Sequence, residues 1–577
     1  MKKRFFTFIA VSLVVMSSVF LMASKDDDFK IVKNLDIFYT LFRELNIFYV
    51  DEIDPEELIE DGISGMLEAL DPYTSYIPES EQDNLNFMTT GKYGGIGALI
   101  RKSGNYSMIV EPYEGFPAQK AGLRAGDIIL KIDNISTKDK EIRDISNELK
   151  GDPNTKVELT IVRTGKNDTL NLSLIRETVS IKNVPYYGLV DDNIGYINLS
   201  NFTQKAATEV KNAVIDLKEQ GATSIIVDLR GNPGGLLIEA VNIANIFIPK
   251  NQEIVSTKGK IKQWDHIYET ETNPIDTVIP LVFIVNRGSA SASEILAGSM
   301  QDLDRGVIVG QRTFGKGLVQ TTRPLSYNTS LKVTTAKYYI PSGRCIQALD
   351  YSNRNDDGSV GHIPDSLISE FLTKNGRKVY DGGGILPDIT TTPETYSKIL
   401  LSLLGKNLIF AYANHYANEH STLPVPREFN ITDEIYNEFV DFLKDKDFDY
   451  QTKSEELLEE LETTAKSEKY HNLAKEHFTE LQKVLAHDKN KDLITFKEEI
   501  SGFLKEEIVS RYYYQKGRIK SVLLTDDNVA RAIELLNNPE QYQTILKSQD
   551  SKRAIMPSNP DEYGATIREL YKDMIGL

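Results

Sequence analysis

The chain has 577 residues, a hydrophobic content of 40% and a formal net charge of −18 at pH 7. This length predicts several domains, and the apolar content is ample for packed cores. The net charge argues against nucleic-acid binding and against electrostatic binding to anionic membrane surfaces. The single cysteine, Cys345, excludes an intrachain disulfide.

Residues 1–24 have the pattern of an export segment. Three basic residues, 2–4, precede a stretch from 5 to 23 without any charge, and an acidic run follows at 26–28. The uncharged stretch fits a signal peptide with a fair cleavage site before Ser24, and it is also long enough to span a bilayer. Both a cleaved signal and a retained membrane anchor therefore stay open. We predict an exported chain in the periplasm or cell envelope, either soluble or anchored.

Residues 25–90 are predicted to form an N-terminal helical segment. One apolar stripe runs through Ile37, Leu41 and Leu45, and a second runs through Ile59, Ile63 and Met66 with helical spacing. Amphipathic helices of this kind are typical of packing or dimerisation elements, so a homo-oligomer is one expectation. The second helix should end near residues 70–73, where Asp-Pro interrupts the pattern.

Residues 91–177 are predicted to form a small β-rich domain. It opens with a glycine-rich loop, Gly94, Gly95, Ile96 and Gly97, which enters a strand. No Gly-Lys-Ser/Thr follows, so a phosphate cradle is disfavoured. The alternative is a loop whose N–H groups bind a peptide carboxylate beside an open strand edge. With the expected helix at 144–149 and strand at 156–163, the region resembles a PDZ domain. The alternative to a peptide-binding domain is a small β-rich domain that only packs against the rest of the chain and binds no ligand.

Residues 178–395 are predicted to form an α/β core. Strand patterns at 195–199 and 224–229 flank an expected helix at 204–219, which is a β-α-β arrangement. The second strand ends in Asp-Leu-Arg-Gly-Asn-Pro and then Gly234 and Gly235. Backbone at such a glycine pair can approach a bound carbonyl closely, although the pair could also be a simple turn.

Within this core, residues 281–294 predict a strand, a tight turn of small residues and a helix start. The arrangement places Ser291 at a helix N-terminus, beside N–H groups without intrahelical acceptors and the positive end of the helix dipole. Such a position suits a nucleophile whose reaction develops an oxyanion. A serine that only caps the helix is the alternative.

A second unusual feature is Lys316, which lies between Gly315 and Gly317 among apolar residues. A lysine kept from water has a lowered pKa and can act as a general base in its neutral form. Only seven histidines occur in the chain, and His266 alone lies near the serine motif in sequence. A separated Ser–Lys dyad is therefore favoured over a Ser-His-Asp triad.

These residues resemble the carboxy-terminal processing, or tail-specific, serine proteases. The family motif GSASASE is matched by residues 288–294, and TFGKG is matched by 313–317. The resemblance extends from about 38 to about 393. It implies that Ser291 is the nucleophile, that Lys316 is the base and that Gln320 orients it. It also implies an oxyanion hole formed by the Ala292 N–H together with that of Gly234 or Gly235.

The resemblance further implies a multi-domain α+β protein. Its parts are an N-terminal helical segment often involved in oligomerisation, a PDZ domain and a crotonase-like α/β protease core. The resemblance is only loose beyond about 393, and residues 396–577 are predicted from their own highly charged, helical pattern to form a helical C-terminal extension. The protein's substrates would be proteins and peptides with exposed C-terminal tails, cleaved through an acyl-enzyme. No cofactor and no metal site is expected. Two alternatives remain open: a catalytically silent PDZ scaffold, and a non-proteolytic acyl-processing enzyme on a crotonase-like core.

Overall fold

The computed structural model describes residues 28–163, 169–354, 359–393, 395–523 and 525–547. The export segment predicted at 1–24 lies outside these residues. The chain divides into two compact units, one of residues 1–78 and 322–333 and one of residues 79–321 and 334–577. Among the described residues, no helix combines the length and apolar character needed to cross a membrane.

The first unit is mainly helical, as predicted. Residues 28–48 form one helix, and α2 spans Pro55–Glu68. Asp54 caps α2 by accepting the Glu56 and Glu57 N–H groups at 2.8 and 3.3 Å, which satisfies two donors that the helix itself cannot. Strand β1 (Ser75–Ile77) pairs antiparallel with the Ser330–Lys332 part of β18.

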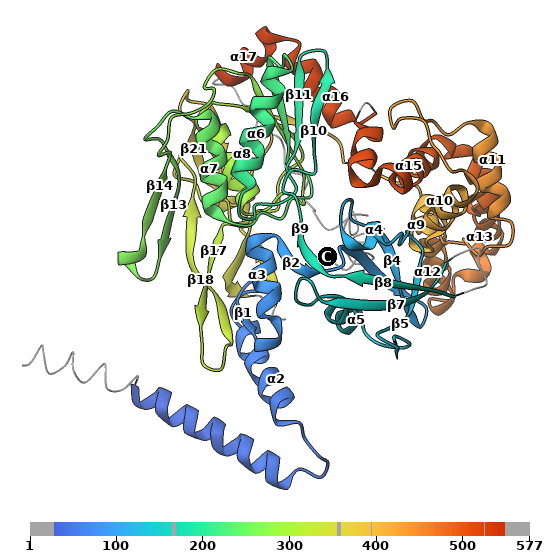
Figure 1. Cartoon of the computed structure of the whole chain (residues 1–577), viewed down its shortest axis with the longest axis horizontal. Helices are drawn as coiled ribbons and strands as arrows, with labels where there is room; N and C mark the ends of the chain where they lie inside the picture. Colours follow the sequence, from blue (N-terminus) through green and yellow to red (C-terminus); the bar gives the residue numbers. More distant parts are fainter. Residues whose placement is uncertain (1–27, 164–168, 355–358, 394, 524, 548–577) are drawn as a thin grey trace, which may run out of the picture. The chain divides into compact units, whose positions relative to one another are not determined.

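In the second unit, residues 92–180 form the predicted β-rich domain (Figure 1). Its main sheet has the strand order β3-β4-β5-β7-β8, with β6 (Ile135–Ser136) added to β5, so that β3 is an edge strand. Alternating residues such as Val157, Leu159 and Ile161 are buried, as a sheet covered on one face requires. The strands and helices of the sheet are β3 (Ala98–Ser103), β4 (Tyr106–Pro112), β5 (Ile128–Ile132), β7 (Lys156–Val162), β8 (Thr169–Ile175), α4 (Pro117–Lys120) and α5 (Ile142–Leu149). A separate two-stranded ladder joins β2 (Lys92–Gly95) to β9 (Glu177–Ser180).

The α/β core is a six-stranded sheet of order β10-β11-β12-β15-β16-β23. The strands from β11 onward are parallel, and β10 is antiparallel to β11. The central strands β12 and β15 are buried at every residue, which explains their continuous runs of branched apolar residues. The strand bounds are β10 (Tyr186–Asp191), β11 (Ile194–Asn198), β12 (Ser224–Asp228), β15 (Leu281–Val285), β16 (Val307–Gly310) and β23 (Ile389–Thr390).

Helices cover both faces of this sheet, and they come from different parts of the chain. One face packs against α6 (Ala206–Glu219), α7 (Leu237–Phe247) and α8 (Ala292–Asp302). The other face packs against α16 (Asp527–Leu536) and α17 (Pro539–Lys547), the last helices described (Figure 1). The C-terminal helices therefore complete the core of the sheet.

Beside the core sheet, β13 (Glu253–Gly259) pairs with β14 (His266–Glu269) and with the Ala336–Tyr339 end of β18 (Ser330–Tyr339). Strand β17 (Leu318–Pro324) pairs with β18 on its other side. After β18, four short strands form two antiparallel pairs, β19–β20 and β21–β22. Their strands are β19 (Leu349–Arg354), β20 (Val360–His362), β21 (Glu370–Leu372) and β22 (Lys378–Tyr380).

Residues 398–522 form a helical region with its own apolar core. Helix α15 contains one non-helical residue, Tyr514 (φ 54°, ψ −160°), which marks a kink between two helical parts. The helices are α9 (Lys398–Gly405), α10 (Leu408–Glu419), α11 (Asp433–Phe442), α12 (Lys453–Ser467), α13 (His471–Leu485), α14 (Lys489–Thr495) and α15 (Lys497–Val522). The predicted multi-domain α+β fold is confirmed.

Candidate active site

Ser291 lies in the turn between β15 and α8, at the N-cap of the helix, as predicted. Its backbone has φ 55° and ψ −113°, a conformation that side-chain-bearing residues rarely adopt. Strain of this kind persists only where the surroundings impose it, and it is concentrated at functional sites. Ser291 is half-buried, so its side chain retains access to solvent.

The two neighbouring serines of the motif have different environments. Ser289 and Ser293 are fully buried. The Ser289 hydroxyl donates to the Leu229 carbonyl at 2.8 Å, and the Ser293 hydroxyl donates to the Asn232 carbonyl at 2.9 Å. These two hydroxyls hold the loop after β12 against the serine turn. Of the three serines, Ser291 is the one left accessible for a reaction.

A buried carboxylate connects Ser291 to the Lys316 loop. Glu294 is 0% exposed, and its Oε2 accepts the backbone N–H of Ser291 at 2.8 Å and that of Lys316 at 2.9 Å. Its Oε1 accepts the Thr313 hydroxyl at 2.6 Å and the Gly315 N–H at 2.7 Å. The backbones of the predicted nucleophile and base therefore meet at one oxygen atom.

Burial also affects the protonation of this carboxyl. Removal from water raises the pKa of Glu294 from 4.5 to about 7, although the four hydrogen bonds that it accepts act in the opposite direction. A group with this pKa changes charge near neutral pH. Its charge state therefore bears directly on the geometry of the Ser291 and Lys316 loops.

Lys316 is half-buried, and it is flanked by two buried glycines. At Gly315 the backbone has φ 86°, and an added Cβ would lie 2.4 Å from the Ala348 Cβ. This close packing explains why the lysine stands between glycines. The buried Tyr338 hydroxyl donates to the Lys316 carbonyl, and it also contacts the Ser291 carbonyl at 3.3 Å. Tyr338 is thus a second link between the two loops.

Of the glycine pair after β12, Gly234 lies against the serine turn. A Cβ on Gly234 would be 2.6 Å from the Ala290 carbonyl oxygen, 2.8 Å from the Ser291 Cβ and 2.8 Å from the Ala292 nitrogen. Any larger residue would collide with the turn. The Gly234 N–H already donates to Asn232 Oδ1 at 2.9 Å. Gly235 packs against Phe202 instead, where an added Cβ would be 2.5 Å from the Phe202 carbonyl oxygen.

Gln320 lies on β17, beyond the lysine loop. Its side-chain amide donates to the Thr334 hydroxyl at 3.1 Å, across the β17–β18 pair. The predicted role of Gln320 in orienting Lys316 remains a prediction.

Of the predicted glycine-rich loop, Gly94 and Gly95 lie instead at the end of strand β2, paired with β9, and only Ile96 and Gly97 link β2 to the edge strand β3. The carbonyls of Gly94, Ile96 and Gly97 accept the N–H groups of Gly151, Ala118 and Tyr113, at 3.1, 2.8 and 2.9 Å. The carbonyl side of the loop is thus fixed to the domain. Gly97 needs its positive φ of 73°, and an added Cβ there would meet the Phe116 Cβ at 2.5 Å. Helix α5 lies beside β3, so the loop stands at one end of a strand–helix pair.

Two residues of this site were missed by the sequence analysis, Glu294 and Tyr338. For Glu294 a signal existed, because a Glu three residues after a Ser N-cap is a capping-box pattern. For Tyr338 the sequence offers no signal, since its contacts depend on how β18 passes the two loops.

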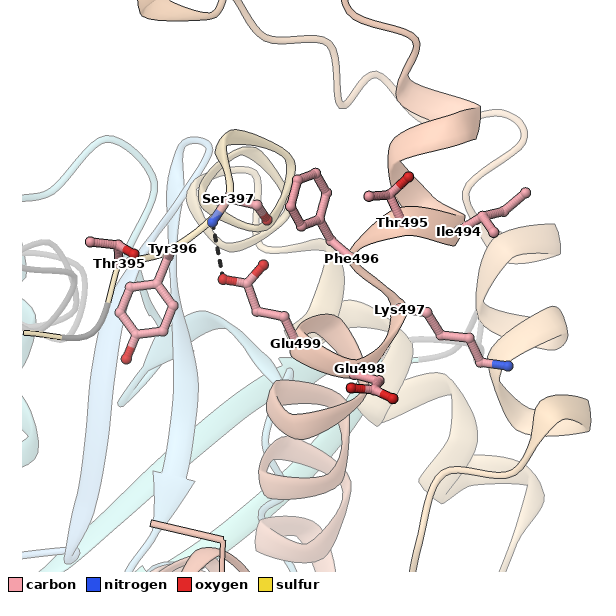
Figure 2. A pocket seen from close by; sticks show the side chains of 9 residues that line it. All are labelled: Thr395, Tyr396, Ser397, Ile494, Thr495, Phe496, Lys497, Glu498 and Glu499. Atoms are coloured by element: carbon pink, nitrogen blue, oxygen red, sulfur yellow. Dashed lines mark hydrogen bonds between the residues drawn. The ribbon is translucent and has the colours of Figure 1, made fainter. Parts of the chain in front are cut away.

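A metal centre or a pocket elsewhere would be an alternative to this site. Among the described residues, no group of three or more His, Cys, Asp or Glu side chains could hold a metal ion. A cavity of about 800 Å³ lies in the helical region, between the residues before α9 and the start of α15. Figure 2 shows that cavity, with the Ser397 N–H donating to Glu499 at 3.0 Å. None of the candidate catalytic residues lines it.

Three family models match the chain. A model of peptidase family S41 matches residues 193–352, and a PDZ domain model matches 108–163. A model described as the C-terminal helical domain of a probable PDZ-protease matches 399–536.

Two curated relatives of this chain are also proteases of this kind. A carboxy-terminal-processing protease of Bartonella bacilliformis is 36% identical over 379 residues, which is 65% of this chain and 83% of that protein. A probable CtpA-like serine protease of Staphylococcus saprophyticus is 33% identical over 392 residues, 66% of this chain and 73% of that protein. Among solved structures, the photosystem II D1 C-terminal processing protease has 29% identity and a TM-score of 0.33, covering 62% of this chain and 92% of that one. The chain therefore belongs to the family of carboxy-terminal processing proteases that carry a PDZ domain.

Proposed function

We propose that the chain is an exported serine endopeptidase with a Ser291–Lys316 dyad. The observation that carries the proposal is the convergence of both backbones on the Glu294 carboxylate, with Tyr338 as the second link. Ser291 is also the accessible serine of its motif, held in a strained turn at a helix N-terminus. Together these features support a nucleophile and a base brought together by the fold.

In this mechanism the neutral Lys316 amine takes the proton of the Ser291 hydroxyl as its oxygen attacks the scissile carbonyl. The oxyanion that forms would lie at the start of α8, where the Ala292 N–H has no acceptor within the helix. The second donor would come from the Gly234–Gly235 pair. Because the Gly234 N–H is already bound to Asn232, we favour that of Gly235. Lys316 then protonates the leaving amine, and water hydrolyses the acyl-enzyme.

The PDZ domain would select the substrate by its C-terminal tail. The segment of Gly94, Gly95, Ile96 and Gly97 runs from the end of β2 to the start of the edge strand β3, and the carbonyls of Gly94, Ile96 and Gly97 are bound within the domain. A peptide that adds to this edge would place its carboxylate near the loop N–H groups. A homo-oligomer, a membrane anchor at residues 1–24 and a periplasmic or cell-envelope location remain parts of the proposal that rest on the sequence.

The test of the dyad is peptide hydrolysis by Ser291→Ala, with Ser293→Ala as the matched control. We expect Ser291→Ala to abolish turnover and to leave the thermal unfolding of the protein unchanged. Ser293→Ala should keep most activity, at a stability cost of about 1 kcal/mol for one lost hydrogen bond. Full activity in purified Ser291→Ala protein would exclude Ser291 as the nucleophile.

The proposed binding of substrate tails by the PDZ domain is tested separately, in full-length Ser291→Ala protein. One peptide is compared with a free and with an amidated C-terminus. A hydrogen bond to a charged group contributes about 1.5–3 kcal/mol, so amidation should weaken binding tenfold or more. Equal affinity for the two forms would show that the PDZ domain does not bind the carboxylate, without bearing on the dyad.

A further inference from the structure

The hairpin formed by β13 and β14 ends in a loop that is exposed throughout. Every residue from 260 to 267 is solvent-exposed. Figure 1 shows this hairpin in green at the left edge of the view, beside α7. Neither the dyad nor the PDZ loop uses these residues, so the exposed character of the tip needs another explanation.

Three large apolar side chains are exposed on this short segment. Ile261 is 41% exposed, Trp264 is 54% exposed and Ile267 is 55% exposed. Trp264 is the single tryptophan of the chain. Tryptophan has an apolar ring and one polar N–H, and it favours the boundary between water and lipid. A cluster of this kind on a hairpin tip indicates contact with an apolar phase.

The same segment is rich in lysine. Lys260 and Lys262 lie in the loop, and the Lys262 side chain is 77% exposed. Lys258 stands directly opposite Lys337 of β18, and both are exposed. Like charges at directly opposed positions destabilise a sheet. The Lys258 amine lies 4.7 Å from the centre of the Tyr339 ring, which offsets part of this repulsion, and an anionic partner would offset more of it.

Acidic groups near the tip offset only part of this charge. Asp265 accepts the Gly259 N–H at 2.8 Å and lies 3.7 Å from the Lys262 amine. Glu253 and Glu269 oppose each other at the other end of the hairpin, away from the loop. The positive charge is therefore concentrated where the apolar side chains are exposed.

We propose that the β13–β14 tip binds the surface of an anionic lipid bilayer. The lysines would contact lipid headgroups, and Trp264 and Ile261 would enter the interface. A lipid surface fits better than nucleic acid, because the tip combines its lysines with aliphatic side chains that have no use in phosphate recognition alone. The net charge of −18 disfavours such binding for the chain as a whole, but charges beyond about 8 Å are screened at physiological salt. This inference does not depend on the dyad.

Because Trp264 is the single tryptophan of the chain, tryptophan fluorescence reports on the hairpin tip alone. Full-length Ser291→Ala protein is mixed with vesicles of phosphatidylglycerol and phosphatidylcholine in equal parts, and Trp264 emission is recorded. We expect a shift to shorter wavelength and quenching by lipids brominated in their acyl chains. Because the signal comes from residue 264, membrane insertion of the apolar segment at 5–23 cannot mimic it. An emission spectrum that vesicles leave unchanged would overturn the proposal.

Charge variants separate the lipid surface from other partners. Removing one lysine near an anionic surface costs about 1 kcal/mol, or about fivefold in partition. The double variant Lys260→Ala/Lys262→Ala should therefore need about thirtyfold more lipid for the same Trp264 shift. The matched control is Lys182→Ala/Lys211→Ala, which removes two exposed lysines from the surface of the α/β domain. This control should need the same amount of lipid as the Ser291→Ala protein without lysine changes. An equal shift with pure phosphatidylcholine, or a shift produced by peptide substrates and not by vesicles, would also overturn the proposal.

Discussion

The two faces of the core sheet are built from different parts of the chain. Helix α8, which carries Ser291 at its N-terminus, lies on the face formed with α6 and α7, all from residues 206–302. The opposite face is covered by α16 and α17, from residues 527–547. The first face carries the proposed nucleophile, and the second covers the other side of the sheet. A parallel sheet needs apolar cover on both sides, so we expect stability to depend on both faces and the proposed catalysis on one.

Contacts on the second face are specific as well as apolar. Arg230, two residues after β12, forms largely buried ion pairs with Asp228 at 2.6 Å and with Asp526, the N-cap of α16, at 2.7 Å. The Tyr542 hydroxyl of α17 binds the backbone of Leu281, the first residue of β15, at 3.0 Å. Helices α16 and α17 thus hold β12, which leads to Gly234, and β15, which leads to Ser291, by contacts on the second face of the sheet.

The largest expected effect comes from Lys316, the proposed base. Arginine stays protonated in proteins, so Lys316→Arg should lose the base while keeping the charge. General-base catalysis contributes about 10²–10⁴-fold, and kcat should fall by that factor. The measurement is turnover of one peptide from about pH 6 to 9, with Gln320→Ala as a milder comparison. Comparable rates for Lys316→Arg and wild type would mean that another group is the base.

Truncation of one leucine on each face tests whether the two faces contribute equally. Leu535 of α16 and Leu217 of α6 are both buried, at 1% and 0% exposure. Each change to alanine should lower the free energy of unfolding by about 2–5 kcal/mol. Urea denaturation followed by circular dichroism measures both. If Leu535→Ala left the unfolding midpoint of the core unchanged, α16 would be a separate appendage.

A pH-dependent effect is expected from Glu294. Its pKa of about 7 in the folded chain lies above the ordinary 4.5, so the folded chain holds a proton that the unfolded chain releases between these values. Stability should therefore fall as the pH rises through this window, by about 3 kcal/mol in total. Glu294→Gln cannot ionise, so the wild-type stability measured relative to this variant should decrease from pH 4.5 to 7. A difference that stays constant with pH would show that folding does not raise the pKa of Glu294.

The sequence by itself determined the local features of this protein. The fully buried β15 strand, the serine at the start of α8 and the lysine between two tightly packed glycines all follow from patterns within a few residues. Helix caps, turns and strand periodicity depend on neighbours along the chain, which is why these features could be predicted. The family followed from the same motifs.

Only the tertiary structure decided which distant groups meet. Glu294 binds the Lys316 loop, Tyr338 bridges the carbonyls of Ser291 and Lys316, and α16 and α17 cover the second face of the sheet. No local pattern encodes these contacts, because each joins segments separated by a strand, a sheet edge or most of the chain. Packing of the whole core fixes them, and with them the place where the serine and lysine loops come together.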